Sequence, residues 1–197
     1  MQKKTLVLLM TMLFFTQGVI LAQQEQGKEF HQQQKVKKQE HKQKQQAEKK
    51  LFQESLKGKT PKERSAAIKK YREAQYQENK AFNAQIHQEN MDTLKKKLAS
   101  NAKLTDAQKN ELISYLESQY QENASFRDQG YSENTALFEQ IANNPNMTQE
   151  QKKAAIKAHN EEQKSEIKAH IQQQQAENKV QREKVRAKVK AQIQTKR

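Results

Sequence analysis

The chain has 197 residues, of which 37 are Lys or Arg and 23 are Asp or Glu, and only 33% are hydrophobic. A chain this polar cannot fill a broad apolar core of the usual globular kind. It has four Gly, no Cys and no Trp, which excludes disulfide scaffolds, zinc-cysteine sites and thiol nucleophiles and argues against glycine-rich phosphate loops. Abundant Gln, Lys, Glu and Ala favour long helices or polar disorder, and we expect neither enzymatic activity nor a cofactor.

The first 22 residues have the pattern of a secretory signal peptide. Lys3 and Lys4 precede an apolar run from Leu6 to Phe15, and the small residue Ala22 follows at the end of the segment. Cleavage after Ala22 is the expected outcome. The alternative is an uncleaved anchor, although the apolar run is shorter than the ~20 residues that span a bilayer. We therefore expect a periplasmic or secreted protein.

Positive charge is concentrated at the two ends of the predicted mature chain. Residues 23–62 contain 11 basic and 5 acidic residues, residues 63–151 contain 11 and 13, and residues 152–197 contain 13 and 5. Export removes nucleic acid as a partner for such ends. The remaining candidates are unfolded or acidic protein clients and anionic envelope polymers or lipids.

The chain divides into a polar segment and a helical domain. Residues 23–59 are rich in Gln and Lys and are predicted to be helical from about 27 to 56 or partly disordered, because only Leu51, Phe52 and Leu56 are available for burial. Residues 60–197 are predicted to form helices at about 61–99, 106–142 and 149–194. The connections between them are short, which favours antiparallel neighbours.

The start of each of these three helices carries a capping box, in which a Thr side chain and a Glu or Gln three residues later satisfy unpaired backbone amides. The first box also has Pro at the first helical position. The cap residues are Thr60 and Glu63, Thr105 and Gln108, and Thr148 and Gln151.

The sequence contains an internal repeat of 44 residues. The run from Gln75 to Asn79 recurs from Gln119 to Asn123, and apolar positions on either side match at the same offset. A weaker third copy includes His159 and Gln163. Duplication explains these matches best. The predicted fold is therefore all-α, with elongated antiparallel helical hairpins in a coiled-coil-like bundle and a basic C-terminal helix.

Two sets of residues are candidates for binding. An apolar and aromatic stripe at helical spacing could form the core, or bind apolar clients if the bundle is one layer thick: Tyr71, Phe82, Ile86, Tyr115, Phe126, Leu137 and Phe138. The basic last helix could contact anions or be an ordinary solvated face: Arg182, Lys184, Arg186, Lys188 and Lys190.

Metal binding and catalysis have little support in the sequence. His159 and His170 share a helix face but are 11 residues apart, about 16 Å along a helix. They cannot bind one ion within a single chain, so no metal site is expected. The carboxylates alternate with Lys in the manner of ordinary helix-surface pairs, and no nucleophile, base and acid cluster together.

Leu104, Thr105 and Gln108 at the head of a helix resemble the LTxxQ motif of the periplasmic Spy/CpxP-like family, and the segment from Met147 to Gln151 resembles a second copy with Met in place of Leu. The resemblance implies an envelope-stress protein built of helical hairpins. Spy-like members form a thin, cradle-shaped dimer that binds unfolded clients without ATP.

These observations lead to two functional hypotheses. The first is a periplasmic, ATP-independent helical chaperone or stress adaptor, which would attract clients through its basic faces and hold them on the aromatic stripe. The alternative is a structural coiled-coil protein that grips anionic lipid or cell-wall polymer through its basic ends. The chaperone requires an accessible stripe, whereas the structural protein requires a buried one. A thin core also favours a homo-oligomer.

Overall fold

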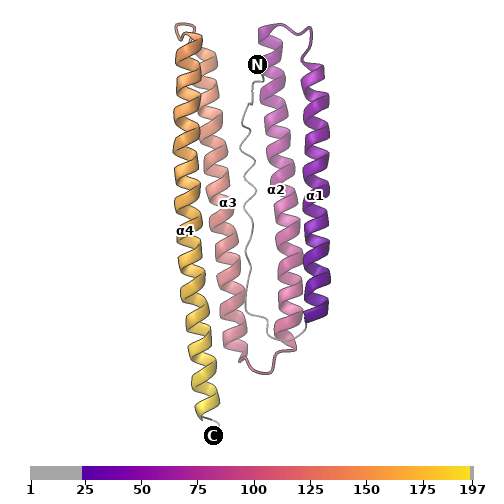
Figure 1. Cartoon of the computed structure of the whole chain (residues 1–197), viewed down its shortest axis with the longest axis vertical. Coiled ribbons are helices and arrows are strands. Elements are labelled where there is room, and N and C mark those ends of the chain that lie inside the picture. Colours follow the sequence, from indigo (N-terminus) through magenta and orange to yellow (C-terminus); the bar gives the residue numbers. More distant parts are fainter. Residues whose placement is uncertain (1–23, 196–197) are drawn as a thin grey trace.

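The computed structural model describes residues 24–195, and these form four long helices: α1 (Gln24–Ser55), α2 (Pro61–Ala99), α3 (Asp106–Asn143) and α4 (Gln149–Thr195). The helices run alternately up and down and make two hairpins, α1–α2 and α3–α4 (Figure 1). No strand occurs within this part of the chain. The prediction of an all-α fold of helical hairpins is therefore confirmed. The predicted signal peptide, residues 1–22, lies outside the described residues.

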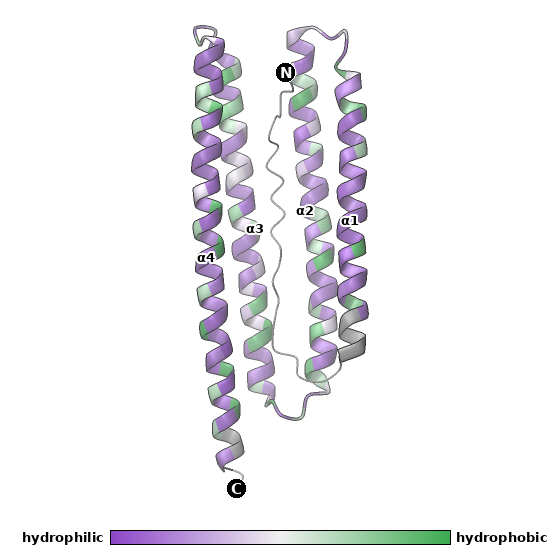
Figure 2. Cartoon of the chain, viewed as in Figure 1, coloured by the Kyte–Doolittle hydropathy of each residue, from purple (hydrophilic) through white to green (hydrophobic). Residues whose placement is uncertain are grey.

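The helices form a single layer. Among the described residues, backbone contacts between helices occur only for α1 with α2, α2 with α3 and α3 with α4, and Figure 1 shows the four helices side by side in that order. Each helix is predominantly hydrophilic, with short apolar patches along its length (Figure 2). A layer one helix thick suits this composition, because it requires little apolar surface to be buried.

Local hydrogen bonds explain where the helices begin. The Thr60 hydroxyl accepts from the Glu63 amide, and the Glu63 carboxylate accepts from the Thr60 amide at 2.8 Å. Thr105 with Gln108 makes the same reciprocal pair, with the Thr105 amide 2.9 Å from the Gln108 Oε1. The pair recurs at the start of α4, whose cap is Thr148 with Gln151. All three predicted capping boxes are confirmed.

The apolar core is small and is strongest where the α2–α3 connection meets the C-terminal half of α4. Leu98, Leu104 and Val185 form a buried cluster there. Among the described residues, the other buried apolar side chains are Ile86, Met91 and Ile141. Amide side chains share the interior with them: the buried polar residues are Gln34, Gln45, Gln108, Gln119, Asn123 and Gln163. Beyond this cluster α4 continues past the ends of the other helices (Figure 1).

Helix α1 lies against α2 along its length and uses polar contacts to do so. The Lys37 ammonium lies 2.7 and 2.8 Å from the two Glu89 carboxylate oxygens. Further along, the Lys44 ammonium lies 2.5 Å from Glu78. The structure places residues 24–55, for which composition left helix or partial disorder open, in one continuous helix.

Charge is distributed unevenly over the layer. Helix α3 carries two basic and seven acidic residues, whereas α1 carries eight and five, α2 nine and five, and α4 eleven and six. Ion pairs connect the acidic α3 to both of its neighbours. Asp128 pairs with Lys80 of α2 at 2.8 Å, and Glu111 pairs with Lys184 and Lys188 of α4 at 2.6 and 2.5 Å. No helix of the described residues is long and apolar enough to cross a membrane.

Candidate functional site

A cluster of histidine, phenylalanine and amide side chains joins α1 to α2. The His41 ring stacks on Phe82, with ring centroids 3.9 Å apart. Asn79 directs its Nδ2 to the Gln75 carbonyl, one turn earlier on its own helix. Its Oδ1 is therefore free to accept from Gln45 Nε2 at 2.7 Å and lies 3.0 Å from His41 Nε2. The amide of Asn79 thus connects the two helices.

The same cluster joins α3 to α4. His170 stacks on Phe126 with centroids 4.2 Å apart, and its Nε2 lies 3.0 Å from Asn123 Oδ1. Asn123 Nδ2 donates to the Gln119 carbonyl and to Gln174 Oε1 at 2.7 and 2.8 Å. Burial lowers the pKa of His170, against a smaller opposing effect of nearby carboxylates.

The two clusters are related by constant sequence offsets. Residues of α2 correspond to residues of α3 44 positions later, as the repeat requires, and residues of α1 correspond to residues of α4 129 positions later. Sequence reasoning missed the second offset and instead treated α4 as a third copy of the 44-residue unit. A signal was present, because residues 41–48 read HKQKQQAE and residues 170–177 read HIQQQQAE.

The contacts between the two hairpins, where α2 meets α3, follow the same 44-residue offset. Tyr76 stacks on Tyr131 and His87 stacks on Tyr120, each at 3.8 Å, and the 44-residue offset exchanges one pair for the other. Glu73 accepts a hydrogen bond from Tyr131, and its equivalent Glu117 lies 2.9 Å from His87. The contacts of the two hairpins are therefore related by an approximate two-fold axis between α2 and α3.

The candidate client-binding residues lie mainly in the seams between helices. Ile86 is buried, and Phe82 and Phe126 are half-buried beneath the two histidines. The half-buried remainder consists of Tyr71 stacked on Phe52, Tyr115 donating to Asn178, Phe138 beneath the Arg72 guanidinium, and Leu137.

The candidate anion-contact residues on α4 divide into two groups. Lys184 and Lys188 are engaged with Glu111, and their hydrogen bonds lower the pKa of that carboxyl to about 2. Arg182 is half-buried and donates to the Asn178 carbonyl at 3.1 Å. Arg186 and Lys190 are exposed. The structure thus leaves only part of the predicted set on the open surface.

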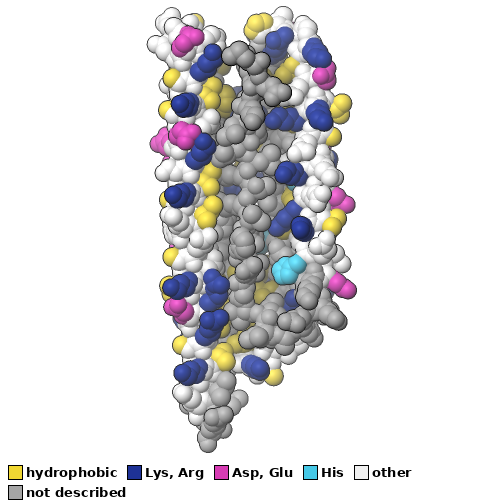
Figure 3. All heavy atoms as spheres, viewed as in Figure 1, with side chains coloured by type: hydrophobic (Ala, Val, Ile, Leu, Met, Phe, Trp, Pro, Cys, Tyr) yellow, Lys and Arg dark blue, Asp and Glu magenta, His cyan; other side chains and the backbone are white. Residues whose placement is uncertain are grey.

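The most exposed apolar side chains occur on the outer helices rather than along the aromatic stripe. Leu51 of α1 is 72% exposed and Val180 of α4 is 63% exposed, and these two positions are equivalent under the 129-residue offset. Each directly follows a lysine, Lys50 or Lys179. On the face seen in Figure 3, Lys and Arg side chains gather along both long sides of the layer, over α4 and over α1 and α2.

Comparison with known proteins gave no assignment: no protein-family model, curated protein or solved structure matches the chain. Within residues 24–195, no group of three or more His, Asp or Glu side chains is placed to hold a metal ion.

Proposed function

We propose that this protein is an exported, ATP-independent helical chaperone that binds unfolded, acidic polypeptides along its outer helices. One observation carries the proposal. Leu51 and Val180, the two most exposed large apolar residues described, occupy equivalent positions on the two basic outer helices, each directly after a lysine. An apolar contact within a basic surface suits an unfolded chain, which exposes apolar side chains and, if acidic, is attracted over long range.

Ion pairs between the helices offset part of the charge difference between α3 and its neighbours. Asp128, Glu139 and Glu111 of α3 are each engaged by lysines of α2 or α4. These pairs neutralise part of the acidic charge of α3, and a positive excess remains on α1, α2 and α4. Attraction by such an excess raises the rate of encounter and falls with added salt.

The mechanism proposed here differs from one in which the aromatic stripe holds the client. Phe82 and Phe126 are each covered on one face by a histidine ring. Exposing these covered faces would require the hairpin to open. The aliphatic residues of the outer helices are available without any such change, so we assign the apolar part of binding to Leu51 and Val180.

Aggregation suppression tests the proposal. The purified protein is mixed without ATP with a reduced, acidic, aggregation-prone protein, and light scattering is followed at about 20 and 300 mM salt. We expect suppression near equal molarity that weakens with salt. The double variant Leu51→Ser, Val180→Ser should need at least about threefold more protein for half-suppression, because two apolar contacts are lost.

The matched control is the double variant Ala47→Ser, Ala176→Ser. It changes two exposed alanines, one on α1 and one on α4, that are related by the same 129-residue offset. It should behave as the unmodified protein. Suppression that does not respond to salt would refute the electrostatic part of the proposal. Equal activity of the Leu51 and Val180 variant would refute the apolar part, and no suppression by a helical protein would refute both.

The packing of the aromatic rings favours a second candidate, a structural envelope protein that binds anionic lipid or cell-wall polymer. Such a protein needs its stripe inside the seams and its basic ends exposed, as Arg186 and Lys190 are. Sedimentation with vesicles containing 30% anionic lipid distinguishes the two functions. Binding that is lost in Arg186→Gln, Lys190→Gln, without aggregation suppression by the unmodified protein, would favour the structural function.

Membership of the Spy/CpxP-like family is part of the same proposal, and the capping boxes at Thr105 and Thr148 support it. Self-association is also proposed, because few apolar side chains are buried within one layer. Sedimentation equilibrium would measure it directly. A monomer at all concentrations would remove the oligomer from the proposal.

A further inference from the structure

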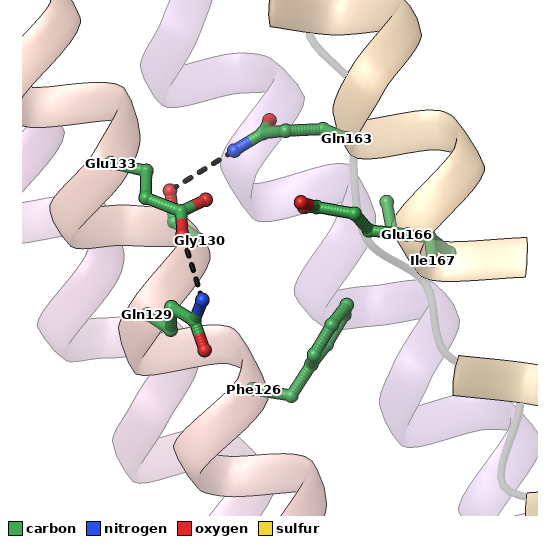
Figure 4. A pocket seen from close by; sticks show the side chains of 7 residues that line it. All are labelled: Phe126, Gln129, Gly130, Glu133, Gln163, Glu166 and Ile167. Atoms are coloured by element: carbon green, nitrogen blue, oxygen red, sulfur yellow. Dashed lines mark hydrogen bonds between the residues drawn. The ribbon is translucent and has the colours of Figure 1, made fainter. Parts of the chain in front are cut away.

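A cavity of about 180 Å³ lies between α3 and α4, comparable in volume to cavities that hold a benzene molecule. Gly130 leaves space on the α3 side, and the Phe126 ring and the Ile167 side chain form apolar walls (Figure 4). The carboxylates of Glu133 and Glu166 approach this space from opposite helices. The lining residues are Phe126, Gln129, Gly130, Glu133, Gln163, Glu166 and Ile167.

The first hairpin shows what fills the equivalent space. Four lining residues are unchanged in type there, since Phe126, Gln129, Glu133 and Gln163 correspond to Phe82, Gln85, Glu89 and Gln34. Gln129 donates to Glu133 at 2.8 Å, just as Gln85 donates to Glu89 at 3.0 Å. The hairpins therefore share a local framework, and the cavity arises from the positions that differ.

At two of these positions, the second hairpin lacks an aliphatic group and a cation that the first hairpin has. Gly130 stands where the first hairpin has Ile86, a side chain only 2% exposed. Glu166 stands where it has Lys37, whose ammonium contacts both Glu89 oxygens at 2.7 and 2.8 Å. A third difference, Ile167 in place of Lys38, makes the cavity wall more apolar.

The carboxylates of the second hairpin consequently lack the cation that the first hairpin provides. Glu133 accepts a hydrogen bond from Gln129 and, among the described residues, no ion pair reaches Glu133 or Glu166. The buried Gln163 is held in place by Asn134, which donates to its Oε1 at 3.1 Å, and by the Gly130 carbonyl, which accepts from its Nε2 at 3.3 Å. The second hairpin therefore has an open space where the first has the Ile86 side chain. It also has carboxylates without a cation where the first has the Lys37 ammonium.

We propose that this cavity binds a primary alkylammonium group. Its aliphatic part would take the place of the Ile86 side chain, against Phe126 and Ile167. Its ammonium would take the place of the Lys37 ammonium, between Glu133 and Glu166. A charged group bound by carboxylates beside an apolar wall gains from both kinds of contact. The proposal does not depend on chaperone activity.

A primary alkylammonium group can come from two sources, a free aliphatic amine or a lysine side chain of a bound polypeptide. The test titrates n-butylamine and, separately, the peptide acetyl-Ala-Lys-Ala-amide into the ¹⁵N-labelled protein. The Gly130 amide resonance is followed by NMR. For a ligand as small as n-butylamine we expect saturation with a Kd of about 1 mM, and no shift with n-butanol or butyrate. Binding of both probes indicates the shared group, and binding of one identifies the source.

Glu166→Lys is the decisive variant, because it recreates the ion pair of the first hairpin and should weaken amine binding at least about 20-fold. Glu183→Lys makes the same charge change at an exposed position on α4, about 25 Å away along the helix, and should bind normally. No saturable shift at 20 mM of either probe would overturn the proposal, as would equal binding by the Glu166 variant. A loss of binding common to both variants would show a general charge effect and would equally overturn it.

Discussion

His170 of α4 lies flat against Phe126 of α3, with ring centroids 4.2 Å apart and ring planes 5° apart. In the first hairpin, the equivalent rings of His41 and Phe82 are 3.9 Å and 7° apart. In both clusters the histidine Nε2 faces an asparagine Oδ1. Because the asparagine amide group donates elsewhere, its oxygen is the acceptor and the imidazole donates. The neutral imidazole satisfies this arrangement.

Acidification should therefore weaken the α3–α4 hairpin. Burial lowers the pKa of His170 below its usual value of 6.5, and the partial compensation comes from Glu122 and Glu177, with Arg127 acting in the same direction as burial. The unfolded chain binds the proton more readily, so stability is fully present above pH 6.5 and is lost as the pH falls through the folded pKa. Urea unfolding at pH 5 to 8 measures this dependence. His170→Gln should show a smaller slope, and an unchanged slope would contradict the assignment.

Asn123→Ala should lower the free energy of unfolding by about 2 kcal/mol. Asn123 is only 3% exposed, and its loss leaves His170 and Gln174 without their partner in the seam. Asn110→Ala is the matched control, because Asn110 is exposed on the same helix. Chemical denaturation monitored by circular dichroism compares the two. Equal stability of both variants would show that the amide connection does not stabilise the hairpin.

Ile86→Ala should be more destabilising, by about 3 kcal/mol. Ile86 is 2% exposed, and the surrounding amide and aromatic side chains cannot close the space without losing their hydrogen bonds and stacking. Ile68→Ala, at a position 39% exposed on the same helix, should have less than about a third of this effect. Thermal or urea unfolding of the two variants gives the comparison. Similar losses would mean that the α1–α2 seam is loosely packed.

Glu111→Gln should loosen the C-terminal half of α4. The hydrogen bonds from Lys184 and Lys188 lower the pKa of the Glu111 carboxyl to about 2. Because this pKa is lowered on folding, its contribution is present above the unfolded value of about 4.5 and is lost as the pH falls towards 2. Hydrogen exchange of residues 184–190 at pH 7 should be faster in the variant. Exchange rates identical to those of the unmodified protein would show that the ion pairs do not hold this segment.

Helix positions could be predicted because the interactions that set them are local. Thr60, Thr105 and Thr148 each bond to a residue three positions later, so a short stretch of sequence contains the whole start signal. The stripe of apolar and aromatic residues was likewise visible in the helical period. The burial of this stripe was not visible, because the rings that cover Phe82 and Phe126 belong to His41 and His170, which lie 41 and 44 positions away along the chain.

The sequence by itself determined the three helices that begin with capping boxes, their approximate boundaries and the equivalence of α2 and α3, because capping, helix propensity and a 44-residue repeat are all readable along one chain. Only the tertiary structure decided that α1 docks on α2 and that a cavity lies next to Gly130. These features depend on the register between helices. Register results from the simultaneous fit of many side chains that are distant in sequence, so no local pattern specifies it.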